Sequence, residues 1–132
     1  MEAEVAVRTR HLEFDTSGHA HITDITSGIR SELGETGLKD GVLTVFVPGA
    51  TGALTTIEYE PGLLEDLDDL WERLIPSGVQ YNHDRTWGDG NGHSHLRASL
   101  LGPSLSVPFT GGEFTLGTWQ QPVLIDCDTR PR

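Results

Sequence analysis

The stretch that decides the fold class is residues 104–125, SLSVPFTGGEFTLGTWQQPVLI. It holds two β-rich segments, 104–109 and 114–125, separated by the tetrapeptide TGGE at 110–113. Paired glycines between two apolar segments are typical of a tight hairpin turn, because glycine adopts the positive φ angles that such turns require. The stretch therefore predicts two antiparallel strands, and with them a sheet that contains at least one hairpin.

Four more segments predict strands on the N-terminal side of this hairpin. β-branched and apolar residues dominate residues 3–14, 42–47 and 53–59, which is typical of strands. In residues 93–101, two histidines and an arginine alternate with serine, leucine and alanine. That alternation is the period-two pattern of a strand with one polar face. The sequence therefore predicts about six strands in all.

Two segments predict helices. Apolar residues recur at every fourth position in residues 25–33, after a capping residue at Thr23 or Asp24 and before two glycines that can end a helix. Leucines recur at helical spacing along residues 61–75, a segment that begins with proline and is followed by another proline. The strands and helices together predict an α+β fold. We expect a single domain over residues 1–132, β-rich and sandwich-like, with two flanking helices.

The composition excludes several classes of protein. Twenty acidic residues against nine basic ones give a net charge of −11, so we expect neither nucleic acid nor a membrane as a partner, because phosphate binding needs clustered cations. No apolar run approaches the ~20 residues of a membrane-spanning helix. The only cysteine, Cys127, fits a reducing cytoplasm. Lys39 is the only lysine, which favours a salt-loving, halophilic host over an ordinary acidic cytoplasm.

Candidate functional residues gather between positions 83 and 95. His83, Asp89, Asn91, His93 and His95 fall within thirteen residues, and a strand would place His93 and His95 on the same face. Imidazoles beside a carboxylate are typical of a divalent-metal site, a phosphate-binding pair or an acid/base pair. The alternative interpretation is that these side chains only form hydrogen bonds that hold the preceding loop, residues 77–92.

Two other residues have both a functional and a structural interpretation, and a third has a structural one. Glu58 can set the tautomer of an imidazole or act as a general base, or it is an exposed strand residue. Arg97 shares the predicted face of the histidines and can bind pyrophosphate through its forked donors, but the excess of carboxylates favours a surface salt bridge. Trp119 is expected to fill the core, since a tryptophan in a β-rich domain is usually buried.

Two motifs resemble the signature of a known family. Residues 104–108 (SLSVP), Gly111 and residues 116–120 (LGTWQ) match one part of it. Residues 89–96 (DGNGHSHL) are similar to the family's D-x-N-[AG]-H-x-H-L stretch, with His83 where an upstream histidine is expected. On these motifs the chain resembles the YjbQ family, also called UPF0047, and the resemblance covers nearly its whole length.

The resemblance implies a compact β-rich fold with flanking helices, assembled as a homotrimer. It also implies a secondary thiamine-phosphate synthase activity, a transferase reaction that joins a hydroxymethylpyrimidine diphosphate to a thiazole phosphate. The expected ligand is therefore a small phosphorylated molecule. The expected catalytic residues are Glu58, His83, Asp89, Asn91, His93 and His95, and Thr51 and Arg97 are expected to bind substrate. A divalent metal, Zn²⁺ or Mg²⁺, is expected on His83, His93 and His95.

The sequence departs from the family pattern at one informative place. The family usually carries His-Thr-Thr-Ala where this chain has Gly49, Ala50, Thr51 and Gly52. A site that lacks one imidazole can bind a ligand without turning it over. The departure therefore supports an alternative function, a non-catalytic trimeric module that holds a metal or a phosphate ligand in a degenerate site.

Overall fold

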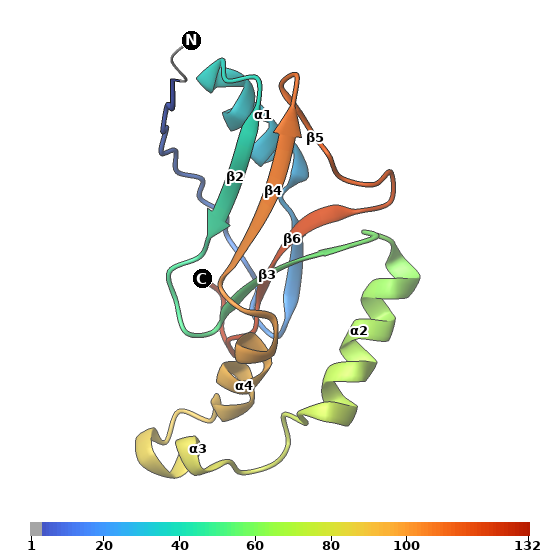
Figure 1. Cartoon of the computed structure of the whole chain (residues 1–132). Coiled ribbons are helices and arrows are strands. Elements are labelled where there is room, and N and C mark those ends of the chain that lie inside the picture. The colour runs from blue at the N-terminus through green and yellow to red at the C-terminus, as the bar shows by residue number, and fades with distance from the viewer. Residues whose placement is uncertain (1–3) are drawn as a thin grey trace.

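The computed structural model describes residues 4–132, and within them it has six strands and four helices (Figure 1). In chain order these are β1 (His21–Asp24), α1 (Thr26–Thr36), β2 (Gly41–Phe46), β3 (Gly52–Ile57), α2 (Pro61–Leu74), α3 (Asn82–Trp87), α4 (Gly92–Leu101), β4 (Ser104–Thr110), β5 (Glu113–Phe114) and β6 (Gln121–Asp126). The strands form two antiparallel three-stranded sheets, ordered β1-β6-β3 and β2-β4-β5. The α+β class is confirmed, with α3 and α4 in addition to the two predicted helices.

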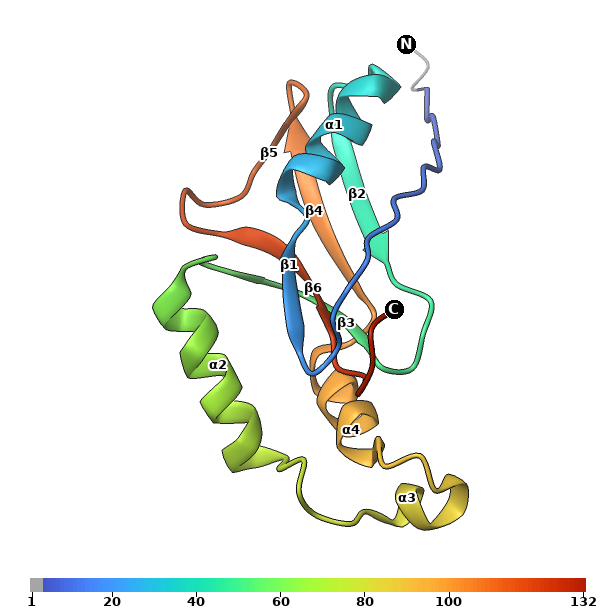
Figure 2. The same ribbon diagram turned by 180° about the vertical axis from the view of Figure 1, so that it is seen from behind.

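Each sheet joins segments that are distant in the sequence. In the first sheet β6 is the middle strand, and its Ile125 pairs with Ile22 of β1 on one side and Ala53 of β3 on the other. In the second sheet β2 pairs with β4 along the whole length of β2. Figures 1 and 2 show β2 and β4 side by side, with β3 and β6 at an angle to them. The connection between α4 and β4 lies against β3, where the N–H of Leu54 donates to the carbonyl of Gly102 at 3.1 Å.

Two clusters of buried apolar residues hold the helices on the sheets. The larger cluster joins β1, β3 and β6 to α2 and α4, and it consists of Ala20, Ile22, Ala53, Trp71, Ala98, Val123, Ile125 and Cys127. The smaller cluster packs α1 on β3 through Ile25, Ile29 and Leu54. α4 therefore reaches the core through Ala98, whereas α3 contributes no buried residue to either cluster.

Both predicted helices are confirmed, and local capping explains their starts. Asp24 Oδ1 accepts from the N–H of Thr26 at 2.9 Å at the start of α1, and that helix ends at Gly37 with a positive φ of 70°. α2 begins at Pro61, and the carboxylate of Glu60 accepts from the next two backbone N–H groups, each at 2.8 Å. Along the described chain, residues 4–132, we find no helix with both the length and the apolar character that a membrane span requires.

The segment predicted as a strand over residues 93–101 is the helix α4. Its buried residues include His93, Ser94, Arg97 and Ala98, which recur at the spacing of one helix face and not at period two. Leucine, arginine and alanine dominate its second half, and these residues favour helices. The prediction that His93 and His95 share a face is therefore wrong, and His93 instead shares a face with Arg97, one turn later.

The N-terminal strand predicted over residues 3–14 is absent from the part that the structure describes. Ala3 lies outside the described residues, and residues 4–14 pair with no strand. Ion pairs from Arg10 to Glu32 and Glu35 hold this segment along α1 instead. A strand needs a neighbouring strand for its backbone groups, and within one subunit these residues have none.

The single strand predicted over residues 114–125 is divided between the two sheets. β5 closes the predicted hairpin with β4, where Phe109 pairs with Phe114, and residues 115–120 then cross to the other sheet before β6 begins. The crossing loop leaves Trp119 72% exposed. The prediction that Trp119 fills the core is therefore wrong, since the loop that carries it belongs to neither sheet.

Candidate functional site

The predicted histidine segment folds so that α3 lies against the start of α4. The rings of His83 in α3 and His95 in α4 are 4.3 Å apart between their centroids and tilted by 41°. His83 Nδ1 also lies 3.9 Å from Asp89 Oδ1. The structure therefore brings together three of the residues that the sequence predicts for the site, although α3 itself was not predicted.

The carboxylate of Asp84 joins the first turns of α3 and α4. One oxygen accepts from the N–H of Tyr81 at 2.9 Å and the other from the N–H of Gly92 at 2.8 Å. These two bonds lower the pKa of the Asp84 carboxyl below its ordinary value. The contact needs glycine at position 92, because an added Cβ would lie 2.8 Å from Tyr81 Cβ. Sequence reasoning missed Asp84. The available signal was the spacing of a capping box, in which an acidic residue lies three positions after the residue that precedes a helix, here Tyr81.

Several buried polar atoms in α3 and around the first turn of α4 have no hydrogen-bond partner. Within residues 4–132 six such side-chain atoms occur, and four of them are His83 Nδ1, Asn91 Oδ1, His93 Nδ1 and Ser94 Oγ. Each buried polar atom left unpaired costs about 1–3 kcal/mol. A group of them in one place is therefore typical of a site that a ligand or bound water completes.

The surroundings of His93 favour its uncharged form. Burial, helped by the positive charge of Arg97, lowers the pKa of the His93 imidazole below its ordinary value. A neutral imidazole offers one donor and one acceptor nitrogen, whereas the charged form offers two donors. His93 is therefore suited to bind a ligand by a hydrogen bond and not as a fixed cation.

An aspartate from near the C-terminus holds Asn91. Asn91 Nδ2 donates to Asp128 Oδ1 at 3.3 Å, and Arg132 pairs with the other oxygen of that carboxylate. Asp128 is only 1% exposed. Burial by itself would raise the pKa of its carboxyl, but hydrogen bonds from Arg132, Thr129 and Asn91 lower the pKa to about 2. The ionised carboxylate can only accept, so it fixes the Asn91 amide with Nδ2 toward Asp128. Sequence reasoning did not identify Asp128 as a site residue.

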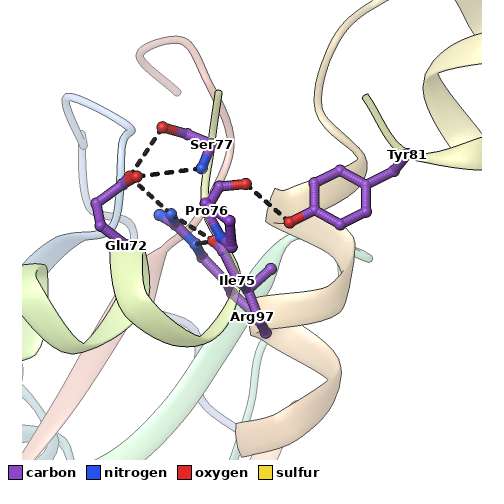
Figure 3. A network of polar contacts seen from close by, with 6 residues as sticks. All are labelled: Glu72, Ile75, Pro76, Ser77, Tyr81 and Arg97. Atoms are coloured by element: carbon purple, nitrogen blue, oxygen red, sulfur yellow. Dashed lines mark hydrogen bonds and ion pairs between the residues drawn. The ribbon is translucent and has the colours of Figure 1, made fainter. Parts of the chain in front are cut away.

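Arg97 makes its contacts with the C-terminal end of α2 (Figure 3). Its Nε and Nη2 donate to the carbonyl of Ile75 at 3.1 and 2.8 Å, and Nη2 also donates to Glu72 Oε1 at 2.9 Å. The predicted salt bridge to a carboxylate is thus confirmed, but the guanidinium is buried and not on the surface. These contacts give Arg97 a structural role, and its role in substrate binding stays a prediction.

The family model described as "UPF0047 protein YjbQ-like" matches residues 10–132. The chain belongs to the YjbQ family. A UPF0047 protein of Archaeoglobus fulgidus is 39% identical over 117 residues, which is 89% of each chain. One from Mycobacterium tuberculosis is 40% identical over 117 residues, covering 89% of this chain and 85% of the relative.

Solved structures agree with the family assignment. A YbjQ-like protein of unknown function from Sulfolobus solfataricus has a TM-score of 0.81 at 28% identity, covering 89% of this chain and 88% of that one. A hypothetical protein from Aeropyrum pernix has a TM-score of 0.80 at 31% identity, covering 89% of this chain and 90% of that one. The descriptions of these relatives name no activity, so they establish the YjbQ fold and family and not a reaction.

Two residues predicted for the YjbQ site lie at opposite ends of β3. Thr51 precedes the strand, and its carbonyl accepts from the N–H of Cys127 at 2.9 Å, so Thr51 is near the Asp128 end of the molecule. Glu58 follows the strand and is exposed. Six strand residues at about 3.3 Å each separate the two by roughly 20 Å. Within one subunit Glu58 and Thr51 therefore cannot contact the same small ligand.

The histidines predicted as metal ligands in this YjbQ-family chain are only partly grouped. His83 and His95 are in contact, but His93 lies on another face of α4 from His95. Across residues 4–132 no three His, Cys, Asp or Glu side chains are placed to hold a metal ion together. This arrangement does not fit a catalytic zinc site, which takes three protein ligands. The divalent metal stays a prediction, and the histidine and asparagine side chains can bind a phosphorylated ligand by hydrogen bonds without it.

Proposed function

We propose that this YjbQ-family protein binds a small phosphorylated molecule at the start of α4 and acts on it as a thiamine-phosphate-synthase-like transferase. The observation that carries the proposal is the group of four buried polar atoms without partners on His83, Asn91, His93 and Ser94. They lie in α3 or in and beside the first turn of the ten-residue helix α4, and the dipole of that helix favours an anion at this end.

The predicted reaction breaks one bond and forms another. The carbon–oxygen bond between the pyrimidine methylene and pyrophosphate breaks, the electron pair leaves with pyrophosphate, and the methylene carbon then bonds to the thiazole. Donors fixed in advance around the departing phosphates stabilise the charge that develops on them. His83, His93 and His95 are the candidate donors, and Asn91 orients the substrate from beside His93.

The assay supplies the folded protein with both phosphorylated precursors and measures thiamine phosphate, at low and at molar salt. We expect product from the native protein and at least a tenfold loss with His95→Gln, since a hydrogen bond to a charged group contributes about 1.5–3 kcal/mol. His11→Gln is the matched control, because His11 is exposed on the N-terminal segment. Absence of product under both conditions, with folded protein, would exclude the transferase function.

The alternative function, a binding module with a degenerate site, is favoured by Gly49. This residue occupies the position of the family's histidine, and a Cβ added there would meet no atom within 4 Å. The Cβ of Gly49→His therefore meets no neighbouring atom. Because Gly49 has a φ of 158°, Gly49→Ala controls for any effect on the backbone. A sharp rise in turnover with histidine and not with alanine indicates a decayed enzyme, and a change in affinity alone indicates a binding module.

We also propose that the protein assembles with itself as a homotrimer. An exposed aromatic side chain near the histidine segment supports self-association, since Trp87 at the end of α3 is 73% exposed. Large exposed apolar side chains are typical of surfaces that a partner covers. Edge strands also need a covering partner, and β2 is an edge strand in this subunit.

A further inference from the structure

The position of α3 depends on polar contacts and not on the core. α3 has no buried residue, so no apolar cluster fixes it against the sheets. It nevertheless carries His83, one of the two rings of the histidine pair. Asp84 inside α3 accepts from the N–H of Gly92, and the contacts of the segment before α3 are the second restraint on how His83 meets His95.

On the N-terminal side, the connection from α2 to α3 is held by the buried guanidinium of Arg97 (Figure 3). Two of its nitrogens converge on the carbonyl of Ile75, which is the residue that ends α2. The same guanidinium donates to Glu72, whose carboxylate in turn accepts from Ser77 N at 3.2 Å and from Ser77 Oγ at 2.8 Å. Arg97 and Glu72 thus fix both ends of the segment 75–77.

A second contact carries this constraint to α3. The hydroxyl of Tyr81 donates to the carbonyl of Pro76 at 2.8 Å, in the middle of the segment that Arg97 holds. Tyr81 immediately precedes α3, and its N–H donates to Asp84 inside that helix. Hydrogen bonds, joined by short stretches of backbone, therefore connect Arg97 through residues 75–77 and Tyr81 to the turn that carries His83.

Arginine suits this role better than lysine. Its planar guanidinium presents several donors in fixed directions, so one side chain can serve a carbonyl and a carboxylate at the same time. Arg97 is 4% exposed, and a buried charge is tolerated only when it is paired and hydrogen-bonded. A lysine ammonium at the same place is a point charge on a flexible stem and would not hold Ile75 and Glu72 in one geometry.

We propose that Arg97 is a positioning residue for the His83–His95 pair. Through the carbonyl of Ile75 and the carboxylate of Glu72, it sets the path of the connection from α2 to α3, and so the place of the His83 ring against the His95 ring. The inference rests on the proposed function only in treating this pair as part of the site. It assigns Arg97 to the geometry of the site and not to contact with the substrate.

The test is NMR spectroscopy of the histidine ring protons, without any ligand. Rings 4.3 Å apart shift each other's proton resonances, and His83→Gln and His95→Gln assign those signals. We expect Arg97→Met to move both signals toward the positions of exposed histidines, and Arg97→Lys to move them part of the way. Arg30→Met is the matched control, since Arg30 is exposed on α1 and forms no ion pair with residues 4–132.

A purely structural role for Arg97 predicts a different result. In that case Arg97→Lys and Arg97→Met lower the melting temperature but leave both ring signals unshifted, and that outcome overturns the proposal. If Arg97→Met does not fold, the ring-proton signals of His83 and His95 in Arg97→Lys and Tyr81→Phe provide the same test. Tyr81→Phe keeps the ring and removes only the bond to Pro76. A failed transferase assay leaves this test intact, because the ring signals need no substrate.

Discussion

Asn91 and Asp128 are hydrogen-bonded across 37 positions of sequence, by an amide that donates to a buried carboxylate. The contact ties the start of α4 to the segment that follows β6. Since Asp128 is also paired with Arg132, one carboxylate connects the candidate site to the C-terminal segment. Stability and site geometry are therefore coupled at this residue.

The ionised carboxylate of Asp128 contributes to the free energy of unfolding, and this contribution is lost in acid. Its pKa in the folded state is about 2, below the ordinary value of about 3.9. A lowered carboxyl pKa stabilises the fold above the unfolded pKa, and this contribution is lost as pH falls from about 4 to about 2. We expect the loss to be about 2 kcal/mol in denaturant titrations of the native protein. Asp128→Asn should lack most of this pH dependence, and the exposed Asp15→Asn should retain it; equal pH dependence in both variants would contradict the assignment.

Gly92→Ala should destabilise the contact between α3 and α4. The added Cβ would lie 2.8 Å from Tyr81 Cβ and 3.0 Å from Asp84 Oδ1, so one helix must move. We expect a loss of about 1–3 kcal/mol, the usual cost of overpacking. Gly34→Ala in α1 is the control, because its Cβ would meet nothing within 4 Å and alanine favours a helix. Equal effects of the two substitutions on the free energy of unfolding would rule out a steric requirement at position 92.

Inorganic pyrophosphate should bind at the start of α4. Titration followed by amide NMR should shift signals of residues 83–95 first, and His95→Gln should weaken binding by about tenfold, the effect of losing roughly 1.4 kcal/mol of interaction with a charged ligand. His11→Gln should leave the dissociation constant unchanged. Shifts confined to any other face of the molecule would place the anion site elsewhere.

The protein should sediment as a homotrimer at micromolar concentration, with α3 near the contact between subunits. Trp87→Ser should then shift the protein toward monomer, because it removes an exposed indole from that helix. Trp119→Ser is the comparison, since it removes an equally exposed indole from the crossing loop. A stable monomer, or dissociation by Trp119→Ser alone, would contradict this arrangement.

The melting temperature should rise with salt. The net charge of −11 weakens the compact state at low ionic strength, and the screening length falls from ~10 Å at 0.1 M to ~3 Å at 1 M salt. Four exposed acids, Glu65, Asp66, Asp68 and Asp69, lie close together on α2. We expect a rise of roughly 5 °C, the shift that about 1 kcal/mol produces in a small domain. Replacing the four by amides should flatten the curve; a native curve that is already flat would favour an ordinary acidic protein.

The sequence predicted the elements whose local signals agree with one another. In α2 the proline at the start, the leucine spacing and the final proline all indicate the same helix. In α4 the signals conflicted, since residues 93–101 alternate in polarity and also place buried residues four positions apart. Only packing decides between these patterns, because Ala98 reaches the core from one face of a helix. β1 was missed for a related reason, since its four residues also serve as the entry to α1.

The candidate site was predictable only where its residues are close in sequence. His83, Asp89 and His95 were grouped correctly because one short segment carries them. The partners of Asn91 and Arg97 were not identified, since Asp128 and Glu72 come from elements 37 and 25 positions away. No local sequence pattern predicts contacts between residues so far apart in the chain. They follow from the pairing of β6 in the sheet and from the packing of α2 and α4 on the same core cluster.

The place of β6 between β1 and β3 also constrains how the chain is made. A ribosome releases β1 and β3 long before it releases the strand that must lie between them. The second sheet, β2-β4-β5, is complete before β6 emerges, whereas the first sheet must wait with its two outer strands unpaired. Such long-range pairing is slow and leaves apolar edges open to other chains. During synthesis the first sheet therefore stays open until β6 pairs between β1 and β3.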